Sequence, residues 1–209
     1  MLRVGLTGSI AVGKSFVSTI LAELGCHVLD ADATAREVVT RGAPGLEKIV
    51  KSFGVAVLKA DGTLDRTKLG SLVFADEEKR QLLNSILHPY IIAAQNEKLH
   101  EWEALDPHGI GVVDAALMIE SGGYRRFDKL IVVHCRPEVQ LERLIARGEL
   151  AAEEARSRIA TQMPQEEKMR YADFLIDSSG DKIDTRRQTE EVYRALRAIN
   201  EQESEVSCV

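Results

Sequence analysis

The sequence predicts an α/β protein built on a five-stranded parallel sheet flanked by helices. Short apolar runs of strand type alternate with longer segments in which apolar residues are spaced three and four apart, as on one face of a helix. Several of these runs are almost continuously apolar, which is typical of parallel strands covered on both faces. A glycine-containing loop also stands between the first run and the first helical segment, where this class binds anions.

Five runs are expected to form strands. In chain order they cover residues 3–7, 27–31, 109–117, 129–135 and 173–178. The segments between them include KSFVSTILAEL at 14–24 and PEVQLERLIARG at 137–148, both with helical spacing. Right-handed crossovers through such helices make successive strands parallel.

The pattern changes after the second strand. Residues 34–106 carry helical signals and a single weak strand run, VAVL at 55–58, and Pro89 is expected to break or restart the helix over 77–105. We therefore predict a helical lobe at 34–106 inserted into a core. That core is assigned residues 1–33, 107–136 and 173–200, with a helical lid region at 137–172 and a flexible tail at 201–209.

Composition limits the partners. The 209 residues include 27 Lys and Arg against 33 Asp and Glu, a formal charge of -6, which argues against nucleic acid as the main partner. Cys26, Cys135 and Cys208 show neither disulfide nor zinc spacing, and a reducing compartment fits them. We find no export signal or membrane-spanning run, so we expect a cytoplasmic protein without a membrane partner, as a monomer or a small homo-oligomer.

One motif indicates a binding site without reference to the rest of the chain. Gly8, Gly13, Lys14 and Ser15 have the G-x-x-x-x-G-K-S spacing of a phosphate-binding loop, between a predicted strand and a predicted helix. Lys14 is suited to the β and γ phosphates of a nucleoside triphosphate, and the Ser15 hydroxyl to Mg²⁺. Val12 is β-branched and should resist a positive φ. The predicted nucleotide-binding residues of this loop are Gly8, Ser9, Ile10, Ala11, Val12, Gly13, Lys14, Ser15 and Phe16.

Other charged residues admit two interpretations each. Asp30 and Asp32 end the second predicted strand and either act on an acceptor hydroxyl or cap the next helix. Asp114 ends the third strand and either positions Mg²⁺ or forms a turn. Arg143 and Arg147 lie four apart on one helix face and are either lid cations for a transferring phosphoryl group or part of a solvated helix.

Taken together, these residues resemble the dephospho-CoA kinase family over residues 2 to 200. The resemblance adds five ordered landmarks to the phosphate loop: DADATAREVV (30–39), GTLDR (62–66), ILHPYI (86–91), QLERL with ARG (140–148) and RIATQMPQEEKMRYADFLID (158–177). It implies a P-loop fold of the nucleoside-monophosphate-kinase type. It also implies ATP-dependent phosphorylation of the ribose 3′-hydroxyl of dephospho-CoA, the last step of coenzyme A biosynthesis.

The resemblance also implies residue roles. Asp32 looks like the catalytic base, with Lys14 and Arg143 as further catalytic residues, and Arg143 and Arg147 look like nucleotide contacts. Ser15 and Asp114 remain the predicted metal ligands, and residues 34–106 look like the lobe that receives dephospho-CoA. Two alternatives stay open: a P-loop kinase for another small acceptor, such as a nucleoside monophosphate, and an ATP-binding regulatory switch.

Three departures from the family pattern stand out. Ala11 and Val12 replace a Gly followed by Ser or Thr, which should stiffen the loop. DAALMIES at 114–121 lacks the usual Pro and Phe of D-x-P-L-L-F-E, and Ser178 stands where the family usually has Asn near the adenine. Gln162 and Lys168 fall within the family pattern, but their residue types alone give them no single role.

Overall fold

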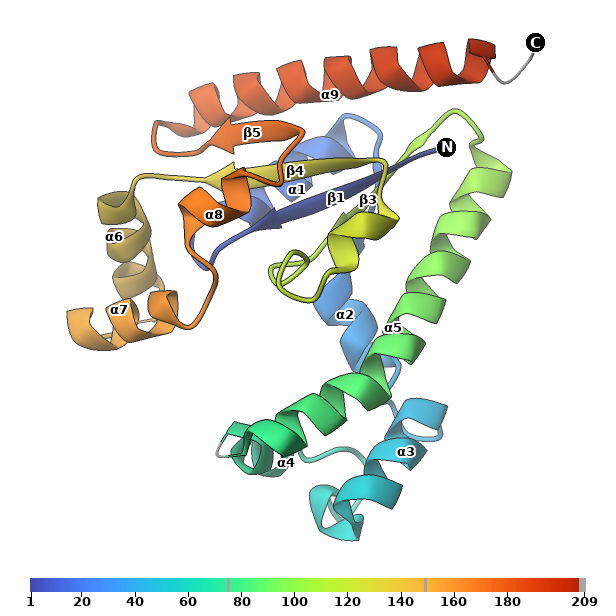
Figure 1. Ribbon diagram of the computed structural model, residues 1–209, viewed down its shortest axis with the longest axis vertical. Helices are drawn as coiled ribbons and strands as arrows, with labels where there is room; N and C mark the ends of the chain where they lie inside the picture. The colour runs from blue at the N-terminus through green and yellow to red at the C-terminus, as the bar shows by residue number, and fades with distance from the viewer. Residues whose placement is uncertain (75, 149, 207–209) are drawn as a thin grey trace. The chain divides into compact units, whose positions relative to one another are not determined.

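The computed structural model describes residues 1–74, 76–148 and 150–206 (Figure 1). The chain forms two compact units, one made of Met1–Leu29 with Glu101–Val209 and the other of Asp30–His100. The first unit carries the sheet, and the second is helical. The described helices include none that is long and apolar enough to cross a membrane.

All five predicted runs form strands. They are β1 (Leu2–Gly8), β2 (His27–Asp30), β3 (Ile110–Asp114), β4 (Lys129–His134) and β5 (Phe174–Asp177). The strand order is β2-β3-β1-β4-β5, and β1 pairs in parallel with both β3 and β4. The predicted five-stranded parallel sheet flanked by helices is confirmed, with β1 at its centre.

One face of the sheet packs against two helices. Helix α1 (Lys14–Glu23) and helix α9 (Lys182–Val206) supply Val17 and Leu196 to a core that also contains Val4 and Ile131 from the strands. These four side chains are fully buried. Burying one such side chain contributes roughly 1.5–3 kcal/mol, so this layer holds the central strands and the helix after the loop in place.

The helical unit has its own core. It contains α2 (Ala31–Glu37), α3 (Pro44–Phe53), the 3₁₀ turn η1 (Val55–Val57), α4 (Arg66–Phe74) and most of α5 (Glu77–Leu105). The buried residues of this core cluster are Val39, Leu46, Ile49, Val57, Leu64 and Leu69. This unit overlaps the lobe that the sequence predicts at 34–106.

Two local expectations in this unit are wrong. The run VAVL forms the 3₁₀ turn η1, because Gly54 ends α3 at a φ of 85° and residues 55–57 then turn again. Leu58 makes only an isolated bridge to Leu64. Pro89 does not break α5, which runs through it. Pro89 and Ser85 are exposed, so water can bind the Ser85 carbonyl that loses its helical partner.

The remaining helices belong to the first unit. The 3₁₀ turn η2 (Gly123–Arg126) precedes β4, and α6 (Pro137–Gly148), α7 (Ala152–Ala160) and α8 (Gln165–Met169) lie between β4 and β5 in the chain. The three α-helices form the region that the sequence predicts as a lid. Helix α9 continues to Val206, so residues 201–206 of the expected tail are helical, and residues 207–209 lie outside the described residues.

Candidate active site

The phosphate loop lies at the carboxyl edge of the sheet. It follows the central strand β1 and leads into α1, while β3 ends beside it at Asp114 and β4 at His134. Ligands of open α/β sheets bind at this edge, where neighbouring strands diverge to opposite sides of the first strand. The topology therefore brings the loop and Asp114 together.

The two glycines of the motif are required by their surroundings. A Cβ on Gly8 would lie 2.6 Å from the carbonyl oxygen of Val133, too close for any side chain. Gly13 has a φ of 85° and lies against Ser178. Within the described residues the backbone N–H groups of Gly13 and Ser15 make no hydrogen bond, so they are open to an anion at the N-terminus of α1.

The loop also contains a strained residue. Ala11 has a φ of 62° and is the one non-glycine residue with a positive φ in the described chain. The left-handed conformation costs such a residue roughly 1–2 kcal/mol. Val12, which was expected to resist a positive φ, does not adopt one and is fully buried in the core of the sheet. The substitution of Ala for the family's usual Gly therefore falls at the position where glycine would relieve strain.

Lys14 and Asp114 form an ion pair across the site. Asp114 is 8% exposed, and its carboxylate Oδ1 contacts the Lys14 Nζ. Ser15 is exposed on the first turn of α1. The described residues contain no cluster of three or more His, Cys, Asp or Glu side chains that would form an all-protein metal site. One hydroxyl and one carboxylate fit Mg²⁺, which usually keeps several waters and needs few protein ligands.

Arg143 comes to the same edge from α6. Its Nη1 donates to Ser178 Oγ at 3.0 Å and its Nη2 donates to the Ser178 carbonyl oxygen at 2.7 Å. Ser178 follows β5 and is buried, and its Oγ also donates to the Val12 carbonyl at 2.5 Å. Arg147 lies one turn further along α6 and is exposed. The structure thus brings Arg143 to the loop and leaves Arg147 in solvent.

A pocket of about 180 Å³ opens beside these groups. Its walls combine the start of α1, the Arg143 guanidinium and the turn between β5 and α9, and Lys182 Nζ lies 5.7 Å above the Phe16 ring. The lining residues are Gly13, Phe16, Arg143, Ser178, Gly180, Asp181, Lys182 and Thr185. An aromatic ring and small residues around a narrow space suit a flat ring.

Two glutamines contact the phosphate loop at Ile10, and a third glutamine holds one of them. The Ile10 N–H donates to Gln162 Oε1 at 2.8 Å, and the Ile10 carbonyl accepts from Gln140 Nε2 at 2.8 Å. Gln165 Nε2 donates to Gln140 Oε1, and Gln165 Oε1 accepts from the Cys135 N–H. Gln140 was not predicted as a site residue, because a glutamine on an amphipathic helix gives no sign in the sequence that it is buried.

Lys168 also has a defined position. Its side chain is fully buried, and its Nζ donates to the Ala116 carbonyl at 2.8 Å and pairs with Glu120 Oε1 at 2.8 Å. Thr7 Oγ1 donates to the same Ala116 carbonyl at 3.1 Å. Lys168 thus fixes the segment that follows Asp114, where the sequence departs from the family pattern by lacking Pro and Phe.

Asp30 and Asp32 separate into two roles. Asp30 is the N-cap of α2, with Oδ1 accepting from the N–H groups of Asp32 and Ala33 at 2.8 and 3.3 Å. The strand ends at Asp30, so the two carboxylates do not lie on one strand, and the predicted cap role falls to Asp30. Asp32 lies in the first turn of α2 and is exposed, and its carboxylate has no hydrogen-bond or ion-pair partner among the described residues.

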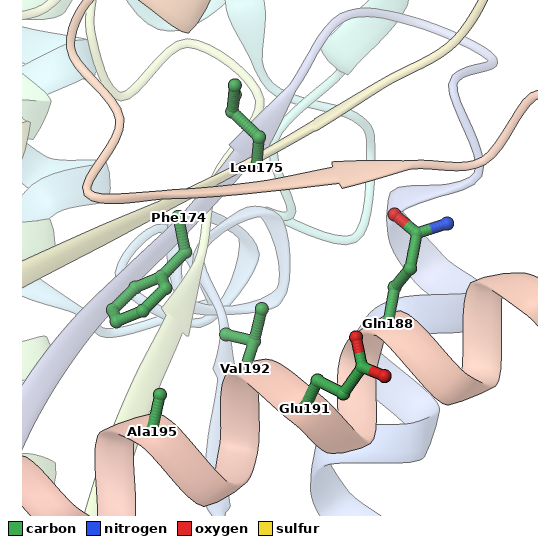
Figure 2. Close-up of a pocket in the computed structure, with 6 residues that line it drawn as sticks. All are labelled: Phe174, Leu175, Gln188, Glu191, Val192 and Ala195. Atoms are coloured by element: carbon green, nitrogen blue, oxygen red, sulfur yellow. The ribbon is translucent and has the colours of Figure 1, made fainter.

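A second pocket, of about 280 Å³, lies between β5 and α9 (Figure 2). Phe174, Val192 and Ala195 provide its apolar wall. Its polar residues already have partners in the fold, since Glu191 pairs with Arg187 and Gln188 bonds to both backbone groups of Asp177. We assign this pocket no part in the site.

Comparison of this chain with known proteins also points to a nucleotide-binding kinase. The family model of dephospho-CoA kinase matches residues 2–184. The chain belongs to the dephospho-CoA kinase family. It is therefore a kinase, a transferase with the P-loop nucleotide-binding fold. The matched range includes the loop, Asp30, Asp32, Arg143 and the segment 162–168.

Individual relatives support the assignment to the dephospho-CoA kinase family. A dephospho-CoA kinase from Bacillus cereus is 45% identical over 197 residues, which covers 94% of this chain and 98% of that protein. The structure of a dephospho-CoA kinase from Campylobacter jejuni is 32% identical, with a TM-score of 0.72 over 95% of this chain and 98% of that one. A Thermus thermophilus protein has a TM-score of 0.80 at 29% identity, over 93% and 96% of the two chains.

Proposed function

We propose that this chain transfers the γ-phosphoryl group of ATP to the ribose 3′-hydroxyl of dephospho-CoA, giving coenzyme A and ADP. The observation that carries the proposal is the family match over residues 2–184, which takes in the phosphate loop and Asp32 together. Family membership favours this acceptor over a nucleoside monophosphate, and an enzyme over a regulatory switch.

ATP is assigned to the loop and the pocket beside it. The open N–H groups of Gly13 and Ser15 would bind phosphate oxygens, and Lys14 would exchange its contact with Asp114 for the β and γ phosphates. The adenine would occupy the pocket of about 180 Å³ beside Phe16. Arg143 would face developing phosphoryl charge from a fixed position, which avoids reorganisation during the reaction.

Magnesium is assigned to Ser15 and Asp114. Both are hard oxygen ligands, and they stand at the start of α1 and the end of β3. When bound, Mg²⁺ neutralises charge on the β and γ phosphates. Release of Asp114 from Lys14 as the triphosphate arrives would free the carboxylate for this role.

Asp32 is assigned the role of base. Its exposed carboxylate has no partner among the described residues, whereas Asp30 is engaged as the helix cap. As the acceptor oxygen bonds to the γ-phosphorus, the bond from phosphorus to the ADP oxygen breaks, and Asp32 takes the proton of the hydroxyl. The resemblance in the DADATAREVV segment supports this choice.

The helical lobe and the lid region are also assigned functions from the family resemblance. Residues 34–106 would form the lobe that receives dephospho-CoA, and 137–172 the lid, with Arg147 as a further nucleotide contact on closure. A reducing cytoplasm fits the buried thiols of Cys26 and Cys135. We propose a monomer or a small homo-oligomer, acting on a small molecule without a nucleic-acid or membrane partner.

A panel of acceptors tests the proposal. Purified protein with ATP and Mg²⁺ is given dephospho-CoA, AMP or shikimate, and ADP release is followed with a coupled assay. The proposal expects the highest kcat/KM with dephospho-CoA. Preference for AMP or shikimate would support a kinase for another acceptor, and ADP release that ignores every acceptor would support a switch; either result rejects the proposal.

A further inference from the structure

The backbone N–H and the backbone carbonyl of Ile10 are both bonded to side chains from the predicted lid region. Gln162, which follows α7, accepts from the Ile10 N–H, and Gln140, in α6, donates to the Ile10 carbonyl, both at 2.8 Å. Ile10 lies in the phosphate loop, directly before the strained Ala11. A strained backbone persists when its surroundings fix it from several directions.

The assignment of each amide follows from its partner. The Ile10 N–H can only donate, so Gln162 presents its oxygen, and the Ile10 carbonyl can only accept, so Gln140 presents its nitrogen. Gln140 is 2% exposed, and its own oxygen accepts from Gln165, which bonds in turn to the Cys135 N–H after β4. The Gln140 side chain is thus oriented, through Gln165, by the backbone at the end of β4.

These contacts leave two N–H groups at the end of the loop open. The Ile10 N–H is engaged by Gln162, whereas the N–H groups of Gly13 and Ser15 make no hydrogen bond within the described residues. Because the glutamines bind the loop through the N–H and the carbonyl of Ile10, they fix its shape without occupying the N–H groups of Gly13 and Ser15. Small errors in such positioning are costly, since a displacement of about 1 Å can lower a rate about 100-fold.

We propose that Gln162 and Gln140 are positioning residues, which hold the Ile10 backbone by one accepted and one donated hydrogen bond and so keep the phosphate loop in its reactive shape against the strain at Ala11. The inference rests on the proposed function, because the reactive shape is that required for phosphoryl transfer from ATP to dephospho-CoA. It gives the lid region a second task, that of supporting the loop.

The opposite roles of the two amides provide the test. Glutamate keeps an acceptor and loses the donor, so Gln162→Glu should retain kcat within about threefold of wild type, while Gln140→Glu should lower it about tenfold. Gln162→Leu and Gln162→Met, which lack an oxygen acceptor, should also lower kcat about tenfold. All values are taken at saturating ATP, which separates them from any rise in the KM for ATP caused by the added charge.

Hydrogen exchange gives a readout besides activity. The peptide containing Ile10 should exchange faster in Gln162→Leu than in wild type, because this N–H loses its partner, and Gln162→Glu should restore slow exchange. Asn200→Leu is the matched control. Asn200 Nδ2 donates to the carbonyls of His108 and Gly109 before β3, at the opposite edge of the sheet, so its loss should lower stability and leave kcat unchanged.

Three results would overturn the inference in an enzyme whose wild type phosphorylates dephospho-CoA. They are an unchanged kcat in both Gln162→Leu and Gln162→Met, an equal loss in Gln162→Glu and Gln162→Leu, and full activity in Gln140→Glu. If one apolar variant fails to fold, the other decides. A wild type that is inactive on dephospho-CoA rejects the proposed function instead, so the two failures are distinguishable.

Discussion

Arg143 donates two hydrogen bonds to Ser178, one to its Oγ at 3.0 Å and one to its carbonyl oxygen at 2.7 Å. The same Ser178 Oγ donates to the Val12 carbonyl in the phosphate loop at 2.5 Å. A cation from α6, the end of β5 and the loop are therefore joined through one small side chain. Ser178 thereby fixes the Arg143 guanidinium beside the loop. The guanidinium is already in place to stabilise negative charge there, without a change of side-chain rotamer.

Loss of the Ser178 hydroxyl should weaken ATP binding. Ser178→Ala keeps the carbonyl acceptor for Arg143 and removes the bonds through Oγ, so we expect the KM for ATP to rise about fivefold with that for dephospho-CoA unchanged. Steady-state kinetics with each substrate varied measures this. Ser71→Ala is the control, because Ser71 bonds within its own helix to the Thr67 carbonyl and is exposed. An unchanged KM for ATP in Ser178→Ala would contradict the role of Ser178.

The two aspartates at the start of α2 should respond differently to the same substitution. Asp32→Asn should lower kcat by about 100-fold or more and nearly spare ATP affinity, since it removes a proton acceptor. Asp30→Asn also loses a charge, but asparagine caps a helix as well as aspartate, so activity should stay within a few-fold of wild type. If Asp32→Asn turns over within a few-fold of wild type, Asp32 is not a catalytic base.

Glycine at position 11 should stabilise the protein. Ala11 has a φ of 62°, so Ala11→Gly removes strain that outweighs the added entropy of the unfolded chain, and we expect a gain of about 0.5–1 kcal/mol. Ala22→Gly, on an exposed position of α1, should instead lose about 1 kcal/mol. Urea unfolding measures both free energies. A loss in Ala11→Gly comparable to that in Ala22→Gly would show that the loop is not strained there.

Stability should fall on the alkaline side through Cys26. Burial raises the pKa of this thiol from 9.0 to about 12, so above pH 9 the unfolded chain loses a proton that the folded chain keeps. Since the folded state binds more protons there, the free energy of unfolding decreases from pH 9 toward pH 12, and this contribution is fully present below pH 9. Cys26→Ala should flatten the decrease measured by urea unfolding. Identical slopes for the two proteins would contradict the assignment.

Much of the architecture could be predicted because its signals are local. The five strands are short apolar runs, and the spacing from Gly8 to Ser15 marks the loop without reference to any distant residue. The prediction fails where a single residue competes with its context. Pro89 continues a helix because its surroundings are exposed, and VAVL turns because Gly54 precedes it.

The support of the site could not be predicted because it depends on contacts between distant residues. Gln140 and Ile10 are 130 positions apart, and Arg143 and Ser178 are 35 apart. The spacing of residues along the chain does not record such pairs, since a glutamine at position 140 would be equally compatible with the solvated face of a helix. The distinction between Asp30 and Asp32 also needed the helix start to be known, because only the residue before the first turn can act as its cap.

Identification of the product tests the central claim most directly. Wild-type protein is incubated with ATP, Mg²⁺ and dephospho-CoA, and the product is analysed by mass spectrometry and phosphorus NMR, with Lys14→Ala as the inactive control. We predict coenzyme A carrying a new 3′-phosphate, formed in equal amount with ADP. ADP without coenzyme A, or a phosphate at another position, would contradict the account.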